Sequence, residues 1–397
     1  MKKKSSSRRR QELEEEGEEK VISSIPLKPR KIVEQHLEEL LEKKGPKREK
    51  ALASIVEWLT SKFESEYEFL TARFATFLYR CISILKKGSA KELQSASEAI
   101  ALLAMIVTDE DNEQEIYTEL LPILSEALKS GPKTLKVFEC LAIITYFCAI
   151  NSDETERTMG IIWDFIHSDS NTNARKCSPK VLVAATSAWS FLVTSVDGWR
   201  FSSKHWQGAV SYLLDLLEND DPLICVAAGE GLAVIFESRN LDKFCSREEK
   251  SSGESSAPKM YSCIEEQIKG VILEKLERLS EKQISDSSDK VKRQYLHVLD
   301  YFKSGCCPEI CESFGRDTLK LSSWSQIIQW NYLKSFLGDN GFYTHMMGNE
   351  KLQDVFGFTP TRISRPDRYR NLYIPTVEEV CHFSFSLQTF TYMSWIS

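Results

Sequence analysis

The chain has 397 residues, of which 42% are hydrophobic and 27% are charged. Such a composition is typical of a folded protein with a large core, long enough for two or three domains or one extended solenoid. The 58 acidic side chains outnumber the 51 basic ones, and the net charge of −7 excludes a globally basic nucleic-acid-binding protein. Local basic patches remain possible.

Three further features narrow the class. Glycine (17 residues) and proline (12 residues) are scarce, which favours helices over turn-rich β folds. The longest apolar run, 99–107, is too short for a membrane-spanning helix, and residues 1–10 contain no apolar segment of a secretory signal. The 11 cysteines are scattered through apolar windows, a pattern that indicates reduced intracellular core cysteines rather than a disulfide framework.

Residues 1–24 are predicted to form a disordered charged tail. Basic residues surround a triple serine, and a run of glutamates follows between Glu12 and Glu19. The basic residues are Lys2, Lys3, Lys4, Arg8, Arg9 and Arg10. They are either part of a solvated tail or a nuclear-import or nucleic-acid-contacting arm.

Apolar residues recur at helical spacing from residue 27 onwards. Lys86-Lys87-Gly88 and Ser130-Gly131-Pro132 are stop signals between helices, while Ser178-Pro179 and Asp221-Pro222 are start signals. The spacing predicts helices at 32–41, 51–59, 69–85, 91–107, 115–128, 134–150, 154–167, 179–196, 206–217, 223–236, 260–279 and 289–302.

Paired helices that recur about every 40 residues predict an all-α, armadillo/HEAT-like helical repeat solenoid. We expect an N-terminal repeat domain at 25–245, a polar linker at 246–259 and a further repeat at 260–304. Aromatic residues become dense after residue 305, which indicates a small C-terminal helical module at 305–373. An atypical apolar tail follows at 374–397.

The sequence contains no constellation that predicts catalysis. Phosphate-binding glycine loops, nucleophile elbows and metal-binding histidine motifs are all missing from it. Cys306, Cys307 and Cys311 form a cluster, but they lack the second ligand pair that zinc requires and fit a reduced helix–turn–helix junction. We therefore expect no catalytic residue, metal, cofactor or small-molecule substrate, and no enzyme activity.

A segment at 199–208 is the first candidate binding site. It combines aromatic and cationic side chains between two predicted helices, a mixture that dominates protein interfaces. The candidate partner-binding residues are Trp199, Arg200, Lys204, His205 and Trp206. We favour the alternative that Trp199 and Trp206 wedge between repeats as core residues.

The second candidate is an arginine-rich stretch at 361–370. Arginine binds phosphate groups better than lysine does, so this stretch is a candidate RNA- or phosphate-binding site. Its residues are Arg362, Arg365, Arg368 and Arg370. A solvated tail is the competing interpretation.

The chain resembles the interferon-related developmental regulator family over roughly residues 25–373. The resemblance rests on Trp189–Thr194 followed by 199–208, on Pro222–Phe236, on Lys292-Arg293-Gln294 and on Asn349–Gly357. It implies a helical, armadillo-like protein without catalysis, associated with transcriptional co-regulation through partner complexes. It also implies association with translationally inactive ribosomes, with the C-terminal part in RNA-facing channels. The family's basic C-terminal helix and tail have no counterpart in the apolar stretch at 374–397.

The leading hypothesis is a scaffold or adaptor in transcriptional regulation, whose concave face holds protein partners. The alternative is a ribosome-associated, RNA-facing regulator of translation. The partners are accordingly proteins of transcriptional regulatory complexes or the ribosome and its RNA, without a membrane. The expected localisation is the nucleus, the cytoplasm or both.

Overall fold

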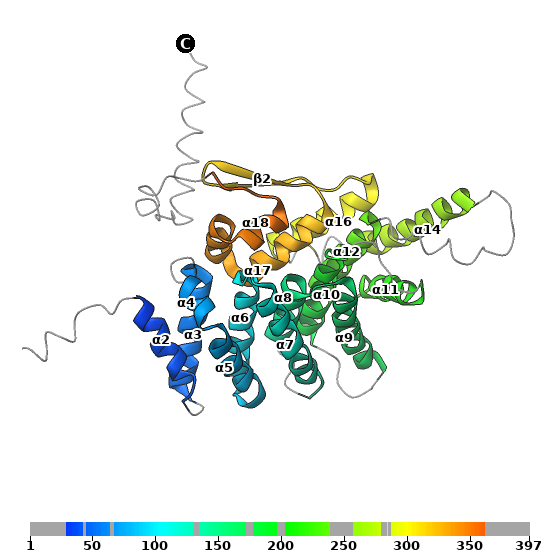
Figure 1. Ribbon diagram of the computed structural model, residues 1–397. Coiled ribbons are helices and arrows are strands. Elements are labelled where there is room, and N and C mark those ends of the chain that lie inside the picture. The colour runs from blue at the N-terminus through cyan, green and yellow to red at the C-terminus, as the bar shows by residue number, and fades with distance from the viewer. Residues whose placement is uncertain are drawn as a thin grey trace, which may run out of the picture.

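The structure is a computed structural model that describes residues 29–42, 45–63, 67–130, 135–171, 178–196, 203–238, 257–278, 284 and 287–361. These residues form an elongated stack of helices, with a C-terminal segment lying across one edge of the stack (Figure 1). No helix in this described part is both long and apolar enough to cross a membrane.

Two rows of helices make up the stack. The inner row consists of α3 (Pro46–Ser61), α6 (Ala90–Ile106), α8 (Leu135–Cys148), α10 (Pro179–Val193), α12 (Pro222–Glu237) and α16 (Asp289–Ser304), each packed against the next. The other helices are α2 (Pro29–Glu39), α4 (Tyr67–Ala72), α5 (Phe74–Lys87), α7 (Glu110–Ser130), α9 (Ser152–Asn171), α11 (Ser203–Leu216) and α14 (Ala257–Arg278).

Each inner helix forms a pair with one of the other helices, and these partner helices make up the outer row. The pairs are α2 with α3, α5 with α6, α7 with α8, α9 with α10, α11 with α12, and α14 with α16. From α6 to α12 the inner helices begin at Ala90, Leu135, Pro179 and Pro222, an almost constant interval. A helix pair cannot bury both of its apolar faces alone, so stacking of pairs creates one continuous core. The predicted all-α helical repeat solenoid is therefore confirmed.

Local capping chemistry sets where the inner helices begin. At the start of α6, Ser89 Oγ accepts a hydrogen bond from the Glu92 amide (3.2 Å), and the Ser89 amide donates to Glu92 Oε2 (2.7 Å). Arg48 on α3 donates to both oxygens of this fully buried carboxylate, at 2.7 Å each, and holds the pKa of Glu92 down to about 2. One capping residue thus joins two neighbouring repeats.

The C-terminal module is not purely helical, which corrects the prediction for 305–373. Strands β1 (Ile310–Phe314) and β2 (Asp317–Leu321) form an antiparallel hairpin. Its two-residue turn begins at Gly315, whose φ of 62° suits glycine. Phe314 packs on the aromatic rings of Trp330 and Phe358, with centroids 6.0 and 5.1 Å away. Tertiary packing of an aromatic residue thus stabilises a hairpin that five-residue strands signal only weakly.

Two helices follow the hairpin, α17 (Trp324–Gly348) and α18 (Glu350–Phe356). Helix α17 packs against α3, α10 and α12, and α18 packs against α6. Gly338 interrupts α17 with φ 69° and ψ 166°, which only glycine adopts readily. The change of direction at this residue lets the C-terminal segment follow the inner row (Figure 1).

Most predicted helices lie where the periodicity places them, with three exceptions of detail. The window at 69–85 is divided into α4 and α5, and α14 begins at Ala257 inside the predicted linker. Helix α11 begins at Ser203 rather than near residue 206, because periodicity marks the first apolar residue of the sequence and not the preceding polar turn. The predicted tails at 1–24 and 374–397 lie outside the described residues.

Candidate functional site

The C-terminal ends of the inner helices differ chemically from the turns that precede them. The segment formed by α17 and α18 covers the last turns of these helices. His345 is fully buried and stacks on Phe63, with ring centroids 4.4 Å apart. Its Nε2 donates to the carbonyl of Leu59, the last turn of α3, at 3.1 Å, across 286 residues of chain. Burial lowers the pKa of His345 to about 4, so the imidazole is neutral at physiological pH.

Asn349 connects this histidine to the next inner helix. Its Nδ2 donates to the Met105 carbonyl at 2.8 Å and to Nδ1 of His345 at 3.1 Å. Its Oδ1 caps α18 by accepting from the Leu352 amide. Since a carbonyl only accepts and an amide nitrogen only donates, both ring nitrogens of His345 have suitable partners in one neutral tautomer.

The ammonium group of Lys351 contacts three backbone carbonyls and one carboxylate at these helix ends. Its ammonium lies 3.0 Å from the carbonyl of Ala104, 2.8 Å from that of Val107 and 3.1 Å from that of Phe147. It also pairs with Glu113 at 2.8 Å. A cation at two helix C-termini is favourable because their unpaired carbonyls carry partial negative charge. We name His345, Asn349 and Lys351 the C-terminal clamp.

Two more contacts extend this closure along the row. Gln329 donates to the Tyr146 hydroxyl at 2.9 Å and to Thr194 Oγ1 at 3.1 Å, which ties α17 to α8 and to the end of α10. Glu237, the last residue of α12, accepts from the amides of Trp324 and Ser325 at 2.6 and 3.0 Å. A carboxylate at a helix N-terminus is the favourable arrangement for the helix dipole.

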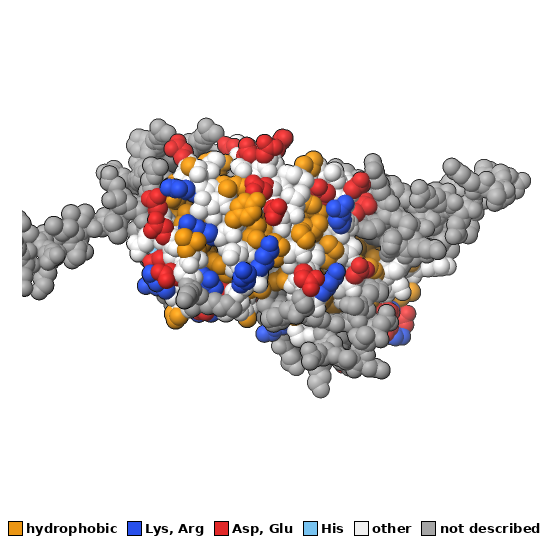
Figure 2. Space-filling view, turned by 60° about the horizontal axis from the view of Figure 1, so that its bottom comes forward, with side chains coloured by type: hydrophobic (Ala, Val, Ile, Leu, Met, Phe, Trp, Pro, Cys, Tyr) orange, Lys and Arg blue, Asp and Glu red, His pale blue; other side chains and the backbone are white. Residues whose placement is uncertain are grey.

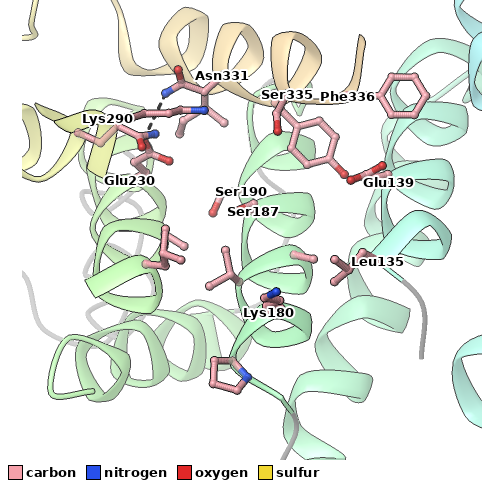
Figure 3. A pocket seen from close by; sticks show the side chains of 18 of the residues that line it. Leu135, Glu139, Lys180, Ser187, Ser190, Glu230, Lys290, Asn331, Ser335 and Phe336 are labelled. Atoms are coloured by element: carbon pink, nitrogen blue, oxygen red, sulfur yellow. Dashed lines mark hydrogen bonds between the residues drawn. The ribbon is translucent and has the colours of Figure 1, made fainter. Parts of the chain in front are cut away.

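A groove lies on the inner row next to α17, over α10. It is a hollow of about 670 Å³ whose walls are α8 and α12 (Figure 3). Helix α16 lies at one side, and α17 runs along the upper edge, which we call the roof. Short side chains of α10, namely Val183, Ala184, Ser187 and Ser190, form its floor. Leu135 on one wall and Leu223 on the other are 37% and 46% exposed, so the groove has apolar rims.

The interior of the groove is acidic. Glu230 accepts from Gln294 (3.1 Å) and Asn331 (3.3 Å), and burial nevertheless raises the pKa of its carboxyl to about 7. Burial also raises the pKa of Glu139 on the opposite wall, although Lys136 lies 2.8 Å from its Oε2. Both carboxyl groups are therefore poorly solvated, and each would gain from a further hydrogen-bond donor.

Two hydroxyl groups of the lining lack hydrogen-bond partners among the described residues. They are Ser190 Oγ, on a side chain only 2% exposed, and the Tyr332 hydroxyl from the roof. Figure 3 shows Ser190 on α10 at the edge of the hollow, and its Oγ faces Gly231 of α12. An unpaired buried hydroxyl typically costs about 1–3 kcal/mol, so it marks a place where a missing partner would be favourable.

The candidate sites expected from the sequence are mostly outside the described residues. Arg362, Arg365, Arg368 and Arg370, the basic residues between Lys2 and Arg10, and Trp199 and Arg200 are all in this group. Lys204, His205 and Trp206 belong to the first turn of α11 and not to a loop, because the helix begins at Ser203. The structure therefore does not test these assignments as binding sites.

The described residues contain no group of three or more histidine, cysteine, aspartate or glutamate side chains arranged to hold a metal. Cys306 and Cys311 are exposed and Cys307 is half-buried, and none of them is in a disulfide. Cys306 and Cys307 follow the end of α16, and Cys311 lies in β1. The predicted helix–turn–helix junction is therefore wrong, because a strand and not a helix follows the turn.

The groove and the clamp were not predicted from the sequence. In the sequence, the short side chains of α10 indicate ordinary packing between helices. The positions of Glu139 and Glu230 indicate acidic residues on a solvent-exposed helix face. One signal was available: Glu230 interrupts an otherwise apolar helix, Pro222–Glu237, in which nearly every other side chain is buried. A carboxyl inside such a window is a candidate functional group.

Comparison with known proteins identifies relatives. Residues 1–298 match the family model described as interferon-related developmental regulator. Interferon-related developmental regulator 2 of Mus musculus is 24% identical over 343 residues, covering 82% of this chain and 72% of that protein. Interferon-related developmental regulator 1 of Homo sapiens is 23% identical over 331 residues, covering 81% of this chain and 69% of that protein.

Among solved structures, the crystal structure of an engineered protein is similar at 19% identity and a TM-score of 0.45. The match covers 69% of this chain and 99% of that one.

Proposed function

Because the chain belongs to the interferon-related developmental regulator family, we propose that it is a non-catalytic scaffold that acts in transcriptional co-regulation through protein partners. The observation that carries this proposal is the groove over α10, a hollow that holds two poorly solvated carboxyl groups between apolar rims. Helical repeat proteins present such surfaces to extended partners. Membership of the family supports a regulatory role in general. The specific role in transcription is part of the proposal.

The test uses the full chain, tagged, as bait in nuclear extract treated with nucleases, so that nucleic acid cannot bridge the contacts. We expect a defined set of proteins to remain bound, and we expect the chain to change transcription when tethered to a reporter promoter. If no protein is retained above background and the tethered reporter is unchanged, the scaffold proposal is wrong. Deletion of residues 1–24 tests the nuclear-import role separately, by the localisation of the chain in cells.

A second candidate function is RNA-facing regulation of translation on the ribosome. The spacing of Arg362, Arg365, Arg368 and Arg370 favours it, since clustered arginines suit phosphate contacts. On the face shown in Figure 2, by contrast, the described basic side chains are interspersed with acidic and hydrophobic ones and form no field of one sign.

Sedimentation of the chain with ribosomes at low and high salt separates the two candidates. Contacts to phosphate weaken steeply as salt rises, so the ribosomal function requires co-sedimentation at low salt that is lost at high salt. Reversing the charge of these arginines should abolish it. Co-sedimentation that survives the reversal would remove the arginines from the proposal.

A further inference from the structure

We propose that the groove over α10 binds a short segment of a protein partner that inserts a lysine or arginine side chain between Glu139 and Glu230 and places apolar side chains on Leu135 and Leu223. This inference rests on the proposed scaffold function, because it names the chemistry of a partner at that site. It is carried by the distribution of charge in the groove, by an unpaired buried hydroxyl and by the two exposed leucines.

Charge separates the interior of the groove from its margin. The lysines of the lining, Lys180 and Lys290, are exposed, whereas the side chains of Glu139 and Glu230 are partly buried. Burial raises the pKa of Glu230, and the charge of Lys290 lowers it, but this effect is smaller than that of burial. A cationic side chain that enters the hollow therefore meets carboxylates inside and leaves the amines in solvent. Lys136 already lies beside Glu139 and also pairs with Glu98, so Glu230, which has only neutral donors bonded to it, is the main acceptor for a new cation.

The hydrogen-bonding groups of the floor and roof point to the same kind of ligand. Ser190 Oγ and the Tyr332 hydroxyl have no partners among the described residues, and a hydroxyl can accept from an ammonium, a guanidinium or a peptide amide. Carboxylates only accept when ionised. Because the hydroxyls can accept and the ionised carboxylates can only accept, a segment that supplies donors can satisfy both kinds of group.

The apolar rims indicate a segment of protein that crosses the groove. Leu135 and Leu223 lie on opposite walls, on α8 and α12, with the short side chains of α10 between them. Exposed leucines on both sides of an open hollow suit a helix or extended peptide with apolar residues on either side of the central cation. Burial of those leucines against the partner supplies the apolar part of the binding energy.

The experiment selects binders from a phage-displayed library of random peptides, about 12 residues long or roughly three helical turns, on the full chain. We expect enriched peptides with lysine or arginine between apolar residues. Leu223→Glu should weaken the selected peptides by at least about tenfold, equivalent to about 1.4 kcal/mol. Leu296→Glu is the matched control, because Leu296 is 50% exposed on α16 and does not line the groove.

Three results would overturn the assignment: no enriched peptide, selected peptides that bind the Leu223→Glu chain unchanged, or peptides that bind the Glu230→Gln chain unchanged. Leu135→Glu provides a second rim variant, and thermal unfolding of each variant confirms that it is folded. For Glu230→Gln we expect about tenfold weaker binding of the cationic peptides, and no change for a peptide whose cation is replaced by alanine.

The two proposals fail in different ways. If Leu223→Glu and Glu230→Gln retain the same nuclear proteins as the unmodified chain, the groove assignment fails and the scaffold function stands. If the unmodified chain retains no nuclear protein but selected peptides still bind in the groove, the scaffold function fails and the groove assignment stands.

Discussion

The inner helices have two regions, a closed half at their C-terminal ends and an open half at the groove over α10. The two halves differ in how their polar groups are satisfied. At the C-terminal ends, His345, Asn349 and Lys351 occupy backbone carbonyls that the helices leave unpaired. Over the preceding turns of α8, α10 and α12, the Ser190 hydroxyl has no partner in the described part of the chain, and the rim leucines stay exposed. A repeat protein can thus satisfy one edge of its helix row with its own chain and leave a neighbouring surface incomplete, and the incomplete surface is the better candidate for a partner.

The largest expected effect comes from breaking the closed half at Lys351. Lys351→Met keeps the unbranched stem of the side chain but leaves Glu113 and the carbonyls of Ala104, Val107 and Phe147 without their cation. Removal of one partner of a poorly solvated ion pair typically costs about 3 kcal/mol. We expect a loss of about that size in the free energy of unfolding by denaturant. Lys303→Met is the control, since its pair with Glu277 is exposed, and we expect a change below about 1 kcal/mol.

A smaller effect is expected from Gly341, where α17 crosses α3. A Cβ at this position would overlap Thr60 Cγ2. Gly341→Ala should therefore lower stability by about 2 kcal/mol through overpacking, despite the better helix propensity of alanine. Gly160→Ala on α9 is the matched control, because no described residue lies within 4 Å of a Cβ added there, and it should raise stability by up to about 1 kcal/mol. Equal effects of the two substitutions on the melting temperature would contradict the close approach.

Glu230 should make the open half sensitive to pH. The folded pKa of about 7 lies above the ordinary value of 4.5, so its contribution to stability is fully present below pH 4.5 and is lost as pH rises to 7. Glu230→Gln should therefore be more stable than the unmodified chain by about 1–2 kcal/mol at pH 8, with little difference at pH 4.5. Denaturant unfolding at both pH values measures this.

The smallest predicted effect distinguishes unpaired from paired hydroxyls. Ser190→Ala removes a buried hydroxyl without a partner and should raise stability by about 0.5 kcal/mol. Thr145→Val removes one that donates to the Leu141 carbonyl (2.8 Å) and lies 3.0 Å from the Thr158 hydroxyl, and should lower stability by about 1 kcal/mol. Calorimetry of both variants provides the comparison. A loss of stability for Ser190→Ala would show that its hydroxyl already has a partner in solution.

The repeat helices were predictable because their signals are local. Start signals such as Asp221-Pro222 and apolar periodicity act within a few turns of chain, and each agrees with the observed helices. The clamp depends on partners far apart in sequence, such as Lys351 and Ala104, 247 residues away, and no local pattern encodes this pairing. The groove was missed for the same reason, since it exists only where α17 stops covering short side chains of α10. The β-hairpin had a weak signal in the alternation of Asp317–Leu321 and the preceding glycine.

The kink at Gly338 has a consequence for how the solenoid keeps its length. The N-terminus of α17 is held by Glu237 at the end of α12, and His345 beyond the kink is held by Leu59 at the end of α3. Both attachments belong to one segment, so the distance between them is fixed. This distance fits only one number of repeats between α3 and α12. Insertion or deletion of a helix pair would put one attachment out of register, so the C-terminal segment ties the repeat number to the integrity of the fold.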